Sequence, residues 1–225
     1  MRFLLYNGLL VCLLLCGCSK NKDEFVAYNK EVIDKEYYLA MRSFDAGNYT
    51  VSLRMFEDFS KKYPLHAVAK NSLQMEILLN YLIEKYQESS ALCDMYLKFY
   101  PLDKMGVEYT RYMKIISEYS LLGGIDISAN KAIELRKLIL EFLLQYSNSK
   151  YKFIILKKQE KIDNFIVISK VLSGDVYFNA NQYLSAIKKY NEAKNYFLSD
   201  NKYITLDEVN KRIDSSKKII INGHF

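Results

Sequence analysis

The chain has 225 residues, of which 50% are apolar and 14% aromatic, with no tryptophan and only two prolines. This composition excludes a low-complexity or disordered protein, and the length is sufficient for one or two domains with a packed core. The formal net charge is +6. No arginine-rich run or aromatic platform indicates nucleic-acid binding, so we interpret this charge as solvated, lysine-rich helix faces. Apolar residues recur every three or four positions nearly throughout, which predicts an all-α fold.

Residues 1–17 resemble the signal peptide of a bacterial lipoprotein. Arg2 precedes an apolar run that ends at Leu15. This run is shorter than the roughly 20 residues that a membrane-spanning helix needs. The run ends in Leu15-Cys16-Gly17-Cys18, an aliphatic residue, a tolerated position, a small residue and a cysteine. This resemblance implies that Cys18 is lipidated and becomes the acylated first residue after cleavage. The alternative is an ordinary signal peptide or anchor with incidental cysteines.

The segment 18–30 is predicted to be the lipidated N-terminus and a polar tether. Cleavage would leave Cys93 as the only unmodified cysteine, so we expect no disulfide within the mature chain. Cys93 lies on an apolar helical stripe, and we interpret it as a small core residue and not as a nucleophile. Ser19 is not acidic, which by resemblance to sorted lipoproteins favours the outer membrane, with the chain facing the periplasm. Two or more acyl chains would make this anchoring stable.

One helical pattern organises residues 31–221. It begins at Ser52 and places apolar or aromatic residues at offsets of 3, 4, 7 and 11, which is the stripe of a helix that buries one side. Pro64 ends this helix, because proline lacks an N–H and disfavours helical geometry in the preceding residue. The pattern returns 37, 83 and 134 residues later, beginning at Ser89, Leu135 and Ala186. Four copies predict a protein built from helical repeats.

The predicted repeats span about 31–64, 67–101, 106–147 and 150–198. The first pairs helices at about 31–46 and 50–63, with Thr50 as a candidate cap, and the second pairs 67–83 with 87–100. The third breaks at Gly123-Gly124 and resumes after Asp126 or Ser128. The fourth has an unusually long first helix at about 150–179, followed by a helix at 183–198. A closing helix at 205–221 begins with a capping box formed by Thr205 and Glu208.

These two-helix units resemble tetratricopeptide repeats, in which small residues let paired helices approach and aromatic residues fill the space between pairs. The matching positions in the first unit are Leu39, Ala40, Gly47, Tyr49, Phe56 and Pro64. Those in the fourth unit are Gly174, Tyr177, Tyr183, Ala186, Tyr190 and Ala193. The sequence therefore predicts an all-α tetratricopeptide-repeat superhelix, or α-solenoid, of about four to five hairpins.

The combination of motifs is narrower than the repeat alone, and it resembles the BamD family. After the lipoprotein cysteine come Y-Y-L-A-M, G-N-Y, F-E-D-F and Y-P, then a second Y-P 37 residues later. The more specific motifs are V-E-Y-T-R-Y-M at 107–113 and Q-Y-S-N-S-K-Y at 145–151. BamD proteins are lipoproteins of the β-barrel assembly (BAM) machinery of the outer membrane. The chain departs from many relatives in a short loop at 123–130 and in a fifth repeat reduced to about one helix. Both departures concern regions on which accessory partners dock, and they leave the central interpretation unchanged.

The resemblance implies two protein-binding regions. The N-terminal repeats would receive the targeting strand of unfolded outer-membrane proteins, and the C-terminal repeats would hold a periplasmic domain of BamA, the barrel insertase. Lys189 stands where relatives carry a basic residue that contacts this domain, although lysine lacks the two-pronged geometry of arginine. Candidates for the substrate groove are Tyr38, Arg42, Asn80 and Tyr81, followed by Tyr109, Arg111 and Tyr112. The alternatives are that the tyrosines pack between helices and that Lys189 is merely solvated.

No catalytic or metal-binding pattern occurs in the sequence. His66 and His224 have no cysteine or carboxylate at metal-ligand spacing, and no phosphate-loop or nucleophile-elbow motif is present. We therefore expect a binding protein that is not an enzyme and has no cofactor or metal. The expected partners are BamA, other assembly-machinery subunits, unfolded outer-membrane proteins and, through the lipid, the membrane, but no nucleic acid. The alternative function is a tetratricopeptide-repeat lipoprotein of another envelope system, such as pilus assembly or cell-wall coordination.

Overall fold

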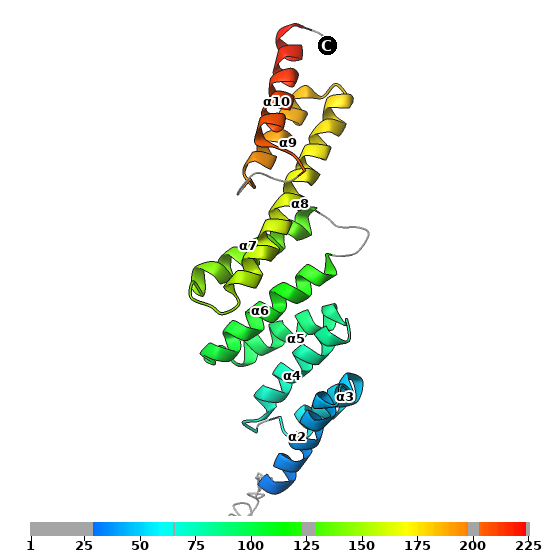
Figure 1. Cartoon of the computed structure of the whole chain (residues 1–225), viewed down its shortest axis with the longest axis vertical. Coiled ribbons are helices and arrows are strands. Elements are labelled where there is room, and N and C mark those ends of the chain that lie inside the picture. Colours follow the sequence, from blue (N-terminus) through cyan, green and yellow to red (C-terminus); the bar gives the residue numbers. More distant parts are fainter. Residues whose placement is uncertain (1–28, 65, 123–128, 198–202, 224–225) are drawn as a thin grey trace, which may run out of the picture. The chain divides into compact units, whose positions relative to one another are not determined.

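The computed structural model describes residues 29–64, 66–122, 129–197 and 203–223 (Figure 1). These residues form helices and turns with no strand among them, which confirms the predicted all-α class. The predicted signal peptide, Cys18, Gly123-Gly124, the candidate caps Asp126 and Ser128, and His224 lie outside the described residues. The helices are α2 (Lys30–Asp45), α3 (Tyr49–Lys62), α4 (Ala69–Leu82), α5 (Tyr86–Phe99), α6 (Lys104–Leu121), α7 (Ala129–Gln145), α8 (Lys152–Asn179), α9 (Tyr183–Lys194) and α10 (Leu206–Ile221).

The chain divides into two compact units, residues 1–36 and residues 37–225. In the first unit, the side-chain oxygen of Asn29 accepts a hydrogen bond from the Glu31 N–H at 3.0 Å, at the beginning of α2. This bond satisfies one of the N–H groups that a helix start leaves without a partner. The second unit contains the rest of α2 and helices α3 to α10. No helix in the described ranges is long and apolar enough to cross a membrane.

Three of the hairpins turn in the same way. The turn residues Gly47, Glu84 and Asn181 have positive φ angles of 75°, 64° and 61°. In each turn, the N–H of the positive-φ residue donates to the carbonyl three residues before it. The N–H of the following residue donates to the carbonyl five residues before itself, and these bonds are 2.8 to 3.1 Å long. This Schellman arrangement ends one helix and leads directly into the next. Because α3 already begins at Tyr49, the prediction that Thr50 caps this helix is wrong.

Buried serines join the two helices of the first and second hairpins. The Ser52 hydroxyl on α3 donates to the Ala40 carbonyl on α2 at 2.9 Å, and the Ser89 hydroxyl on α5 donates to the Ile77 carbonyl on α4 at 2.9 Å. Both serines are fully buried. The two bonds are related by the same 37-residue shift as the sequence pattern. They let the helix backbones approach closely and give each buried hydroxyl a partner.

In each of three hairpins, two core positions pair a large side chain on one helix with a smaller one on the other. A Cβ atom at Gly174 on α8 would lie 2.6 Å from Cδ1 and 3.0 Å from Cζ of Tyr190 on α9. Only glycine therefore leaves room for this ring. The three equivalent pairs are Ala40 with Phe56, Ile77 with Cys93, and Gly174 with Tyr190. The prediction that Cys93 is a core residue is confirmed by its complete burial.

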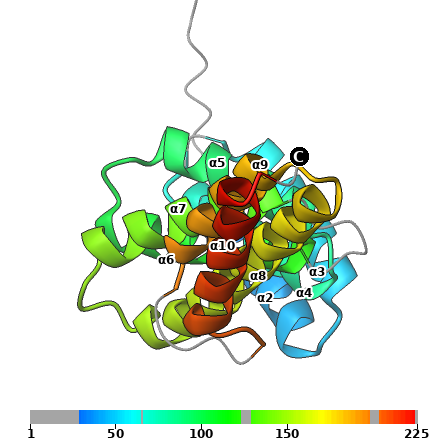
Figure 2. The same ribbon diagram turned by 90° about the horizontal axis from the view of Figure 1, so that it is seen from above.

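The long helix α8 takes part in two hydrophobic cores. Its first half, through Ile155 and Ile162, packs with the buried face of α7. Its second half, through Val167 and Val171, packs with α9 and α10. Figures 1 and 2 show α10 beside α9 at this end of α8.

Helix α10 begins as predicted, whereas helix α9 ends earlier than predicted. Helix α10 begins with the predicted capping box, in which Thr205 Oγ1 accepts from the Glu208 N–H and Glu208 accepts from the Thr205 N–H. Helix α9 ends at Lys194, four residues before the predicted end. The N–H groups of Asn195 and Tyr196 bond to carbonyls three residues earlier, which tightens the last turn. This turn places the Tyr196 ring 5.1 Å from the guanidinium of Arg136.

Candidate binding surface

The two most specific sequence motifs meet in the structure. Tyr112, from V-E-Y-T-R-Y-M on α6, stacks on Tyr151, the last residue of Q-Y-S-N-S-K-Y, with ring centroids 4.1 Å apart and an angle of 11° between the planes. The Tyr109 ring lies 6.3 Å from the same Tyr151 ring. On the preceding hairpin, Tyr81 and Tyr86 have ring centroids 5.4 Å apart. We call these five half-buried side chains the tyrosine surface.

Local structure positions each part of the tyrosine surface. Tyr109 and Tyr112 are three residues apart and therefore share one side of α6. Tyr151 is held at the entrance to α8, because its N–H donates to the Ser149 hydroxyl at 3.1 Å. Tyr81, Tyr109 and Tyr112 all pack against the buried core that includes Met113. The surface is thus part of the packed repeats, and each of its five side chains is half-buried.

The tyrosine surface is uncharged. Burial raises the pKa of the Tyr109 phenol above its ordinary value, and neighbouring tyrosines raise it further. Burial also raises the pKa of Tyr112. Neutral phenols combine a large apolar ring with a hydroxyl that both donates and accepts hydrogen bonds. Such a surface suits contact with protein segments of varied sequence.

The first four predicted groove residues lie in three different places. Tyr38, which is 63% exposed, and Arg42, also exposed, lie four residues apart on one side of α2. Tyr81 belongs to the tyrosine surface. Asn80 is only 4% exposed, and its amide donates to the Glu76 carbonyl at 2.9 Å. Its side chain is therefore part of the interior of the second hairpin and is not available at the surface.

Lys189 is half-buried and engaged within its own hairpin. Its ammonium lies 3.2 Å from Glu192 Oε2, and Lys170 on α8 donates to the same oxygen at 2.8 Å. Lys170, followed by Lys189, lowers the pKa of Glu192. Two lysines thus share one carboxylate, which leaves a net positive charge on this part of α8 and α9. The predicted contact between Lys189 and BamA stays a prediction, and its site is on a different hairpin from Tyr38.

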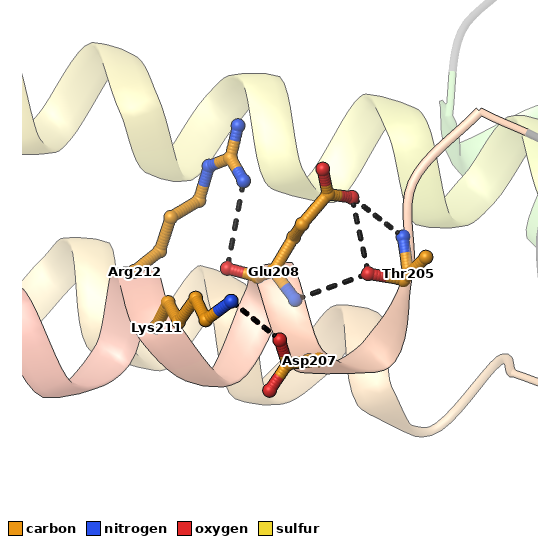
Figure 3. A network of polar contacts seen from close by, with 5 residues as sticks. All are labelled: Thr205, Asp207, Glu208, Lys211 and Arg212. Carbon is orange, nitrogen blue, oxygen red and sulfur yellow. Dashed lines mark hydrogen bonds and ion pairs between the residues drawn. The ribbon is translucent and has the colours of Figure 1, made fainter.

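A second polar group, which the sequence did not reveal, joins α8, α9 and α10. Asp175 Oδ1 accepts from the Tyr190 hydroxyl at 2.7 Å and from Arg212 Nε at 3.1 Å. These residues line a cavity of about 300 Å³. Figure 3 shows the α10 side of this region, where Arg212 also donates to the Glu208 carbonyl. Asp175 and Arg212 are 37 residues apart in sequence, and no local pattern indicates that they pair.

The remaining candidates for chemistry have structural roles. The imidazole Nδ1 of His66 accepts from the Val68 N–H at 3.3 Å. Burial raises the pKa of the Cys93 thiol far above its ordinary value, which disfavours the reactive thiolate. Within the residues that the structure describes, no three His, Cys, Asp or Glu side chains are grouped so as to hold a metal ion.

Comparison with known families finds a match over most of the chain. The model of the family YfiO, described as outer membrane lipoprotein, matches residues 30–207. The chain belongs to this family. The matched region contains α2 to α9, and with them both motifs of the tyrosine surface. No curated protein matches the chain.

Proposed function

We propose that this chain is the BamD-type lipoprotein of a β-barrel assembly machinery, which scaffolds BamA and recognises unfolded outer-membrane proteins. The proposal is carried by the family match, because it covers the helical repeats and names an outer membrane lipoprotein. The tyrosine surface supports it, since two motifs typical of BamD proteins form one contact there. In this proposal the chain is anchored by lipid on Cys18, faces the periplasm and makes or breaks no covalent bond.

The two proposed binding regions differ in their chemistry. The exposed pair Tyr38 and Arg42 offers an aromatic ring and a guanidinium to an unfolded chain, which can bind both an aromatic residue and a carboxylate. Lys170 and Lys189 share Glu192 and keep a net positive charge, which suits an acidic group on a folded domain. We propose the first region for substrates and the second for BamA.

Site-specific photocrosslinking in cells tests both assignments. A photoreactive residue at Tyr38 should crosslink to newly made outer-membrane proteins, and one at Lys189 should crosslink to BamA. Leu144 on α7 is 87% exposed and provides a control position that should crosslink to neither. Purification of the lipidated chain from detergent-solubilised membranes should also recover BamA. Absence of BamA from both experiments would refute the proposed function.

A further inference from the structure

A second cavity, of about 200 Å³, lies between α5, α6 and α7. Its walls are mainly apolar, formed by Leu97 on α5, Ile115 on α6, and Leu138 and Phe142 on α7. Three charged side chains, Asp94, Arg111 and Lys114, complete the lining. Helix α7 therefore contributes only apolar side chains to the lining, and the charged side chains come from α5 and α6.

The charges in this wall do not balance. Lys114 on α6 forms an ion pair with Asp94 on α5. Arg111 has no ion pair with any described residue, and its Nε atom is buried without a hydrogen-bond partner. Nearly all buried polar groups in proteins have partners, so an arginine donor without one is unusual. One positive charge at the cavity is thus left without a counter-charge.

Arg111 belongs to the same motif as the tyrosine surface but lies on another side of the helix. Successive residues of an α-helix are about 100° apart, which places Arg111 well away from Tyr109 and Tyr112 around the axis of α6. Arg111 faces the cavity with Lys114 and Ile115, the residues three and four positions later. The cavity is therefore separate from the tyrosine surface, from the Tyr38 and Arg42 pair, and from Lys189.

We propose that this cavity binds a carboxylate on a short aliphatic stem, the chemistry of an aspartate or glutamate side chain, presented by a partner protein. The planar guanidinium of Arg111 matches a carboxylate with two parallel hydrogen bonds, and the ligand would supply the acceptor that Nε lacks. The apolar walls would enclose the stem. Asp94 beside the site disfavours a doubly charged anion such as phosphate. This contact is additional to the proposed function and does not depend on it.

Titration with small carboxylates tests the proposal on the full mature chain in detergent micelles. The reporter is the Nε–H resonance of Arg111 in arginine-labelled protein, and the exposed Arg54 on α3 is an internal control. Butanoate should shift the Arg111 resonance saturably and leave the Arg54 resonance nearly unchanged. Butanamide, which has the same stem without the charge, should bind at least about tenfold more weakly.

Two variants and three peptides complete the test. Arg111→Met should keep the fold, because no partner of the guanidinium is lost, and should abolish the saturable butanoate response of the neighbouring Leu138 methyl groups. Arg111→Lys keeps the positive charge but lacks the two parallel N–H donors of the guanidinium, and it should weaken butanoate binding about tenfold. If Arg111→Met unfolds at a lower temperature than the wild type, the comparison of butanoate binding by Arg111→Lys and the wild type decides the test.

The peptides identify the source of the carboxylate. Acetyl-Leu-Glu-Leu-amide should bind more tightly than its glutamine analogue, and more tightly than acetyl-Leu-Leu-Leu with a free C-terminus. A preference for the free terminus would overturn the assignment to an acidic side chain. Equal shifts with butanoate and butanamide, or equal butanoate binding by wild type and Arg111→Lys, would show a solvent-filled cavity and overturn the proposal entirely.

Discussion

Replacement of Gly174 by alanine measures how closely α8 and α9 approach. The added Cβ would lie 2.6 Å from Cδ1 of Tyr190, far inside ordinary van der Waals contact. The ring cannot move aside easily, because Tyr190 is 1% exposed and its hydroxyl donates to Asp175 at 2.7 Å. Overpacking of this kind costs up to about 3 kcal/mol. Alanine in a helix interior recovers about 1 kcal/mol relative to glycine.

The expected net effect of Gly174→Ala is therefore a loss of about 2 kcal/mol in the free energy of unfolding. In a chain of this size, such a loss lowers the melting temperature by roughly 4 to 8 °C. Denaturant unfolding and calorimetry of the mature chain measure both quantities. Val176→Ala, at a 68% exposed position of the same helix, is the matched control and should change stability by less than about 0.5 kcal/mol.

A double-mutant cycle separates the steric effect from helix propensity. In a Tyr190→Ala background the ring is gone, so Gly174→Ala should become stabilising by about 1 kcal/mol. The same change of sign would not occur if Gly174 were needed for backbone conformation. An increase in stability on Gly174→Ala in the wild-type chain would refute the close approach of these helices.

Three further predictions concern other parts of the repeats. Glu84→Gly should raise the free energy of unfolding by about 1 kcal/mol in chemical denaturation, because Glu84 has a φ of 64°, and no gain would contradict a strained turn. Cys93→Phe should destabilise the second hairpin by about 1 to 3 kcal/mol. Adding Ile77→Ala should restore part of this loss, because it recreates the alanine–phenylalanine pair of the first hairpin. A double variant no more stable than Cys93→Phe alone would contradict the size compensation. Burial raises the pKa of Glu76, so its contribution to stability is complete below its unfolded-state pKa and is lost as pH rises through the higher folded-state pKa. Unfolding measured across pH 4 to 8 should therefore show Glu76→Gln gaining stability relative to wild type as pH rises, whereas a constant difference would show that Glu76 titrates normally.

Much of the fold was predictable because it depends on contacts between near neighbours in sequence. The stripe at Ser52 and Ser89 indicated helices with one buried side, and both serines are buried against the partner helix. Asn181 has a positive φ in its turn, which asparagine tolerates better than most residues. Thr205 and Glu208 form the predicted capping box. The end of α9 was not predictable from the stripe, which continues to Phe197, because the last turn bends where Tyr196 meets Arg136.

The candidate sites were predictable only in part. Motif similarity singled out V-E-Y-T-R-Y-M and Q-Y-S-N-S-K-Y, but their contact through Tyr112 and Tyr151 joins residues on two different hairpins. The stripe pattern likewise did not separate the buried Asn80 from its neighbour Tyr81. Arg111 was predicted as a groove residue together with Tyr109 and Tyr112, although helical geometry places it on another side of α6.

The amino-acid sequence by itself determined the helix class, the repeat interval and most helix ends, because these follow from interactions within one or two helical turns. Only the tertiary structure decided which residues of different hairpins meet, as Tyr112 meets Tyr151 and Tyr190 meets Gly174. The physical reason is that helical periodicity defines which side of a helix is buried. The distance and angle between packed helices depend on the sizes of side chains that are far apart in the sequence.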